Sequence, residues 1–177
     1  MSGYVFDTGP LRHFCLSGWL GALKFVVGDA PVFIPESVEQ ELLLQRGRDP
    51  GLSQIFKADW IDVDRSDDLA FLKLFARYEQ RLVGKNPQKN RGECGVLALG
   101  KARGWTVVID DGAPRRIAAE EKIEKTGTLG LLCKAVREER LTVEMVESLT
   151  DDLLAGEYYL PFGPGEFWAW AKEQGVI

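Results

Sequence analysis

Short, mainly apolar runs alternate along the chain with longer amphipathic stretches. The runs cover residues 4–6, 31–34, 60–63 and 105–109, and polar or turn-forming residues follow each of them. Runs of this length are typical of buried parallel strands, while the stretches between them have the spacing of helices. Strands that alternate with helices predict an α/β fold with right-handed crossovers.

Helical spacing defines the elements between these strands. The first helix is expected to begin near Pro10 and to continue through Leu23, because its apolar residues recur every three or four positions. Residues 46–51 are expected to form a loop, and residues 121–125 a last short strand. Further helices are expected from Pro35 to about Leu44, after Asp68 to about Val83, from Gly92, from about Pro114, from about Gly127 to Glu138, from Thr142 to Leu154 and around 166–173.

Composition is that of an ordinary globular protein. The 177 residues are 45% hydrophobic and 28% charged, which suits one domain with a sizeable core. No apolar run approaches the ~20 residues that cross a bilayer, and the N-terminus lacks a secretion signal. We therefore expect a cytoplasmic protein without membrane contact. The three scattered cysteines favour free thiols, and a single histidine without CxxC pairs disfavours zinc, so any metal should be a hard cation with oxygen ligands.

Charge is distributed unevenly. Residues 142–177 carry a net charge of −6, so the rest of the chain sums to about +1. Residues 80–92 contain bases and no acids, which is typical of a solvated loop but also suits an edge that contacts phosphates. We divide the chain into a main domain, residues 1–157, and an acidic and aromatic C-terminal extension, residues 158–177. The aromatic face of this extension is expected to pack on the domain itself or on a partner.

Five acids lie where strands end or on apolar helix faces. Asp7 follows the first strand and Glu93 opens a helix, although each could simply serve the end of a helix. Glu41 lies on the buried face of its helix, where an unpaired carboxylate is costly. Asp110 and Asp111 point to opposite faces if the strand continues, and alternation places Asp111 with the cluster. Four acids at one sheet edge repel one another strongly unless a divalent cation neutralises them.

These acids belong to five motifs whose order resembles the PIN-domain ribonucleases, in particular a prokaryotic subgroup similar to VapC-type toxins. The motifs are Asp7-Thr8-Gly9-Pro10-Leu11, then Ile34-Pro35 with Val38 and Glu41-Leu42, then Gly92-Glu93-Cys94-Gly95-Val96-Leu97-Ala98-Leu99, then Asp110-Asp111 with Arg115 or Arg116 and Ala118, and finally Gly127-Thr128-Leu129-Gly130-Leu131-Leu132. Two features depart from the pattern. Many such toxins have Thr or Ser at the position of Ile109, and the aromatic extension lies beyond the usual core.

The resemblance implies a PIN-like three-layer sandwich with a central parallel sheet of about four or five strands. It implies an Mg²⁺- or Mn²⁺-dependent endoribonuclease acting on single-stranded RNA, and, as for many members, the toxin of a toxin–antitoxin pair with an antitoxin partner. We also expect a homodimer. The implied catalytic acids are Asp7, Glu41, Glu93 and Asp111. The implied metal ligands are Asp7, Glu93 and Asp111, with Asp110 as a ligand if the strand register differs. Candidates for substrate binding are Thr8, Lys85, Lys89, Arg91, Arg115 and Arg116.

Other classes of protein are compatible with acids at strand ends. A receiver domain normally pairs two acids after its first strand, and a phosphatase of the haloacid-dehalogenase type needs Asp-x-Asp there, whereas position 9 is Gly. A non-catalytic module on the PIN scaffold, binding RNA or a protein partner, is the remaining alternative. Metal binding separates the last alternative from a nuclease, because an interaction module needs no cation.

Overall fold

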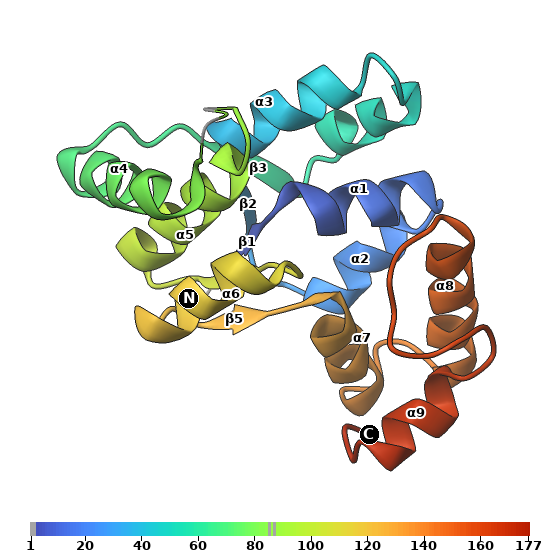
Figure 1. Ribbon diagram of the computed structural model, residues 1–177. Helices are drawn as coiled ribbons and strands as arrows, with labels where there is room; N and C mark the ends of the chain where they lie inside the picture. Colours follow the sequence, from blue (N-terminus) through green and yellow to red (C-terminus); the bar gives the residue numbers. More distant parts are fainter. Residues whose placement is uncertain (1–2, 85, 87) are drawn as a thin grey trace.

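The computed structural model describes residues 3–84, 86 and 88–177 (Figure 1). Within these residues, five parallel strands form one sheet in the order β3-β2-β1-β4-β5. The strands are β1 Tyr4–Phe6, β2 Val32–Pro35, β3 Ile61–Asp64, β4 Thr106–Val108 and β5 Lys125–Thr126. The expected parallel sheet of four or five strands is therefore confirmed.

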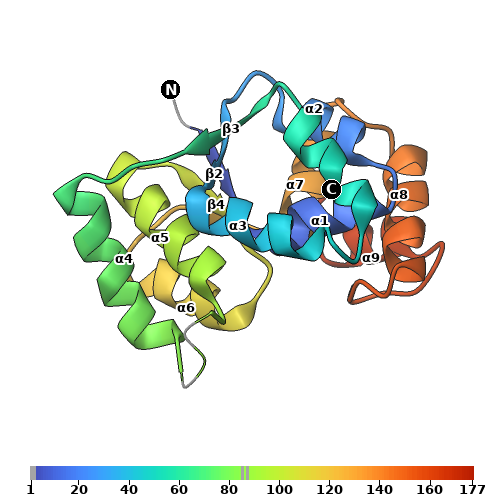
Figure 2. The same cartoon turned by 90° about the horizontal axis from the view of Figure 1, so that it is seen from above.

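Helices cover both faces of the sheet (Figures 1 and 2). One layer contains α4 Leu69–Leu82, α5 Arg91–Arg103 and α6 Gly112–Glu120. The other contains α1 Thr8–Leu16, α2 Leu20–Val27, α7 Thr128–Arg137, α8 Val143–Ala155 and α9 Phe167–Glu173. Helix α3, Glu36–Gln45, contacts both α1 and α5 and thus bridges the two layers. The molecule is an α/β sandwich of the expected kind.

Two local predictions are wrong. The single helix expected through Leu23 breaks at Gly18, whose φ of 79° is left-handed, a conformation that glycine adopts readily. The apolar stripe continues across this break, so periodicity alone does not reveal it. The strand expected over residues 121–125 is also displaced, because β5 covers only Lys125–Thr126. The loop expected over residues 46–51 is present as far as Asp49, where the 3₁₀ helix η1, Pro50–Lys57, follows and buries Leu52 and Ile55 against the core.

The centre of the sheet determines where the acids lie. Val5 and Phe6 of β1 are fully buried between β2 and β4, as the unbroken apolar pattern predicts for a central parallel strand. The backbone N–H of Asp7 donates to Val108 O at 3.1 Å, so β1 and β4 end side by side. Their carboxyl ends, where open α/β sheets bind ligands, therefore deliver residues to one edge.

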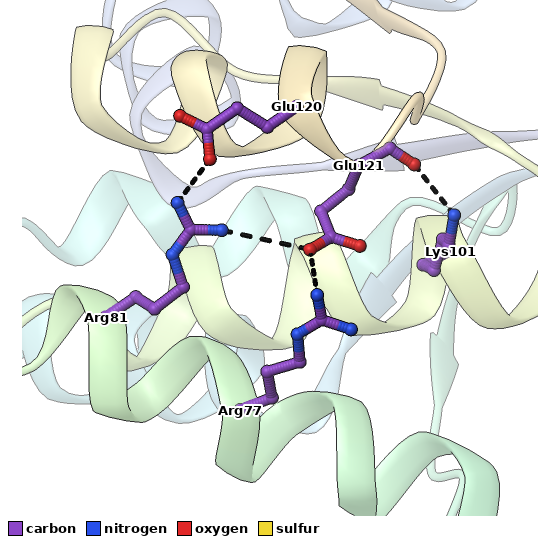
Figure 3. Close-up of polar contacts among 5 residues, drawn as sticks. All are labelled: Arg77, Arg81, Lys101, Glu120 and Glu121. Atoms are coloured by element: carbon purple, nitrogen blue, oxygen red, sulfur yellow. Dashed lines mark hydrogen bonds and ion pairs between the residues drawn. The ribbon is translucent and has the colours of Figure 1, made fainter.

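An exposed ion-pair cluster ties the helices of one layer together (Figure 3). Arg77 of α4 lies 2.5 Å from Glu121, and Arg81 pairs with both Glu120 and Glu121. Lys101 of α5 donates to the backbone oxygen of Glu121 at 2.7 Å. Exposed pairs contribute only about 0–1 kcal/mol each. The cluster nevertheless fixes the C-terminal end of α6, opposite the end at which Asp111 lies.

The C-terminal extension lies against α8 and its neighbours. Leu160, Phe167 and Ala171 are buried, and α9 packs on α8. Arg137 of α7 donates to Val176 O at 2.5 Å. The boundary at residue 157 stays a prediction, but these contacts fasten the extension to its own chain. Among the residues with described positions, none of the helices combines the length and apolar character that a bilayer span requires.

Candidate metal centre

Three elements deliver carboxylates to one point at the carboxyl edge of the sheet. Asp7 follows β1 directly, and Asp111 precedes the first residue of α6 after β4 ends. Glu93 lies in the first turn of α5, which packs on β1, β2 and β4. The sequence puts each acid at the boundary of an element, and the parallel pairing of β1 with β4 brings the boundaries together.

The three acids form a compact group. Asp7, Glu93 and Asp111 each offer one carboxylate oxygen, and these oxygens lie within 4.8 Å of one another. Exposure rises from Asp7, which is only 5% exposed, through the half-buried Glu93 to the exposed Asp111. The group is therefore closed at Asp7 and accessible from solvent at Asp111.

The electrostatics of this group fit a hard cation. The Oδ1 atom of Asp7 is buried and has no hydrogen-bond partner among the described residues. Burial raises the pKa of Asp7 well above its ordinary value, and the charges of Glu93, Glu41 and Asp111 raise it further. Burial also raises the pKa of Glu93, followed by the charges of Glu41 and Asp111. Carboxylate oxygens that repel one another are the donor set that Mg²⁺ or Mn²⁺ accepts.

Glu41 lies beside this group, but both of its carboxylate oxygens already accept hydrogen bonds. Its Oε2 accepts from Thr8 Oγ1 at 2.5 Å, and its Oε1 accepts from the backbone N–H of Gly92 at 2.8 Å. A side chain at position 92 would place Cβ 2.5 Å from Glu41 Oε2, so glycine leaves the room for this contact. Glu41 thus caps the start of α5, and the Thr8 hydroxyl orients Glu41. No pattern in the sequence predicts this role of Gly92, because Glu41 lies 51 positions away.

Asp110 points into a different environment. Its carboxylate accepts from the backbone N–H of Thr128 at 2.8 Å, from the Thr128 hydroxyl at 2.7 Å and from the Tyr158 hydroxyl. The ring of Tyr158 packs edge-on against His13, with centroids 4.6 Å apart. Asp110 is not one of the three acids whose oxygens converge. Instead it joins the start of α7 to the C-terminal extension.

The basic residues predicted to bind substrate are dispersed. Arg115 donates to Ile109 O at 2.8 Å and lines a cleft beside Asp111, whereas Arg116 is exposed. Arg91 pairs with Glu79 at 3.2 Å. Lys89 is exposed, and its charge lowers the pKa of Glu93. Lys85 lies outside the described residues.

A cleft of about 630 Å³ opens beside Asp111. The turn after β4, the end of β5 and residues 157–161 line it. Sequence reasoning missed Lys125 and Tyr158 as neighbours of the site. Nothing in the local pattern places Tyr158 next to Asp110, because the two residues are 48 positions apart.

Comparison with known proteins agrees with this geometry. A family model described as a PIN domain matches residues 3–162, which include every acid discussed above. No match was found among curated proteins. PIN domains are generally nucleases that use a divalent metal, and the three acids form a cluster that could hold one. With most of its length matched, the chain belongs to the PIN-domain family.

Proposed function

We propose that this protein is a metal-dependent endoribonuclease that cleaves phosphodiester bonds of single-stranded RNA. The observation that carries the proposal is the convergence of Asp7, Glu93 and Asp111, whose oxygens lie within 4.8 Å of one another. The buried Oδ1 of Asp7, which finds no hydrogen-bond partner in the part of the chain that the structure describes, supports it. These three residues would hold one or two Mg²⁺ or Mn²⁺ ions.

Each residue of the group contributes differently. When bound, the cation would activate water and stabilise charge on the phosphate. Asp7, being buried, provides a fixed oxygen at the closed end of the group. Asp111 is exposed, so the RNA backbone approaches from its side. Glu41 occupies the N–H of Gly92 and keeps α5 in place, so that Glu93 stays aligned with Asp7.

We also propose a place among the VapC-like toxins, with an antitoxin as partner and a homodimeric state. The order of the five motifs supports this subgroup. The separation of charge, with a net −6 over residues 142–177, leaves the rest of the chain slightly basic. A toxin of this kind would bind the RNA phosphates through the basic part, since acidic side chains repel phosphates.

Cleavage of a defined single-stranded RNA by the purified protein tests the proposal. We expect products with Mg²⁺ or Mn²⁺ and none with EDTA. Glu93→Gln should reduce the rate by about 100-fold or more, because the cation supplies several kcal/mol of charge stabilisation. Glu144→Gln, the same change at an exposed position of α8, is the matched control and should leave the rate unchanged. RNA binding without metal-dependent cleavage would instead favour the non-catalytic module.

A further inference from the structure

The cleft beside Asp111 has a size that suits a small ligand. Its volume of about 630 Å³ lies within the ~300–1,000 Å³ range of ligand sites. Its lining includes Asp111, so the cleft is continuous with the exposed side of the three acids. Anything that fills it therefore lies next to the candidate metal centre.

One wall of the cleft belongs to the C-terminal extension, which is anchored on both sides of Tyr159. The Tyr158 hydroxyl donates to Asp110, and Leu160 is buried in the core. Tyr159 itself is 86% exposed, more than any other large apolar side chain that the structure describes. The backbone is thus held on both sides of Tyr159, whose aromatic ring lies largely in solvent at the cleft.

The rest of the lining carries charge of both signs. Arg115 and Lys125 supply two cations, and the contact of Arg115 with Ile109 O holds its guanidinium in place. Asp111 belongs to the acid group, and the carboxylate of Asp110 is occupied by Thr128 and Tyr158. Glu157 remains as an acid that opposes an anionic ligand.

We propose that this cleft is a subsite for one unpaired nucleotide of the RNA, next to the position of cleavage. The base stacks on Tyr159, and the adjoining phosphate pairs with Lys125 and Arg115. The proposal rests on the proposed function in taking RNA as the substrate. A stacking ring combined with cations is how proteins hold single-stranded nucleic acid, since every base has a π-face. A stable protein partner would instead cover a much broader surface, about 800 Å² on each side.

Fluorescence of a short single-stranded RNA that contains 2-aminopurine tests the subsite, because stacking quenches this base. The titration uses the full chain in EDTA at low salt, and the Glu93→Gln protein with Mg²⁺. We expect quenching with the native residue and with Tyr159→Phe. Tyr159→Leu should lose the quenching and bind about 5- to 100-fold more weakly, the usual range for loss of one stacked base. Phe25→Leu, which removes another exposed ring, on α2, is the matched control and should change neither the quenching nor the affinity for RNA.

Two charge changes sharpen the test. Lys125→Gln should reduce the slope of log affinity against log salt by about 0.7, the value for one phosphate contact on a single strand. Glu157→Gln should strengthen binding, since it removes the opposing charge. Equal quenching and affinity in Tyr159→Leu and the native protein would overturn the subsite. So would a change in self-association without a change in RNA binding, which would identify a protein contact.

The two proposals can fail separately. A protein that quenches through Tyr159 but cleaves no RNA with any metal would retain the subsite and lose the nuclease. A protein that cleaves in a metal-dependent manner, with the same affinity and rate after Tyr159→Leu, would retain the nuclease and lose the subsite.

Discussion

Asp110 and Asp111 are adjacent in the chain, yet their surroundings differ completely. Asp110 accepts hydrogen bonds from Thr128 and Tyr158, whereas Asp111 faces the carboxylates of Asp7 and Glu93. The first environment supplies donors to a negative charge, and such bonds stabilise a fold by about 1.5–3 kcal/mol each. The second collects like charges and therefore costs stability until a cation binds. The hydrogen bonds of Asp110 thus stabilise the fold. The position of Asp111 beside two other carboxylates lowers the stability of the metal-free protein.

The largest expected effect comes from removing the C-terminal extension, whose Tyr158 contacts Asp110. Truncation after Gly156 deletes Tyr158 together with the buried Leu160, Phe167 and Ala171. Loss of one buried Phe alone costs about 3–5 kcal/mol, comparable with the whole stability of many domains. We expect the truncated protein to aggregate or to lose its near-UV circular dichroism. A folded, monodisperse product would show that the extension docks on a partner instead, or that its aromatic residues stabilise nothing.

A matched pair of substitutions tests the comparison directly. In the metal-free protein, Asp110→Asn should reduce the free energy of unfolding by about 2–4 kcal/mol, because it weakens contacts to Thr128 and Tyr158. Asp111→Asn should raise it, because one repelling charge is removed, while abolishing cleavage. Urea denaturation in EDTA measures both. Two changes of the same sign would contradict the division of roles.

Much of the difference in position between Asp110 and Asp111 could be predicted from the sequence. The apolar runs before Asp7 and Asp110 predicted β1 and β4, and parallel strands bring their carboxyl ends to one edge. Alternation along the strand placed Asp111, not Asp110, with the other acids, and the structure has the same arrangement. The hydrogen bond from Tyr158 was not predictable, because 48 residues without a repeating pattern separate it from Asp110. The break at Gly18 was missed because the apolar spacing is the same on both sides of it.

The pH dependence of the free energy of unfolding measures how much the repulsion and burial of Asp7 and Glu93 destabilise the metal-free protein. The pKa values of Asp7 and Glu93 are raised above the ordinary 3.8 and 4.5, so both bind protons more tightly in the folded state. Metal-free protein should therefore lose stability as the pH rises from about 4 through the raised values, by up to about 1.4 kcal/mol per pH unit and proton.

Glu93→Gln isolates the contribution of one of these carboxylates to the pH dependence of stability. It should flatten the loss of stability that sets in as the pH rises above the ordinary carboxylate pKa of about 4.5, since one of the two raised carboxylates no longer titrates. Urea midpoints in EDTA, compared with those of Glu144→Gln, measure the difference. Profiles of equal slope in the two variants would mean that the acids do not interact as their proximity implies.

The smallest effect is expected from a single hydroxyl. Tyr158→Phe keeps the ring against His13 but removes one donor to Asp110, while Thr128 still supplies two. We expect a loss of about 1.5 kcal/mol in the free energy of unfolding. In the Asp110→Asn background the same change should cost much less, because the two side chains interact directly. Additive losses would place the contribution of Tyr158 elsewhere.

The strand order β3-β2-β1-β4-β5 also determines when the three acids can come together during synthesis of the chain. β1 is made early on the ribosome, but its neighbour β4 follows about a hundred residues later. Pairings between such distant segments form slowly, because the chain between them must first be closed into a loop. Asp7 is therefore synthesised long before Asp111 is available to lie beside it. A nascent chain that ends before Asp111 cannot assemble the group of Asp7, Glu93 and Asp111, which forms only once β4 pairs with β1.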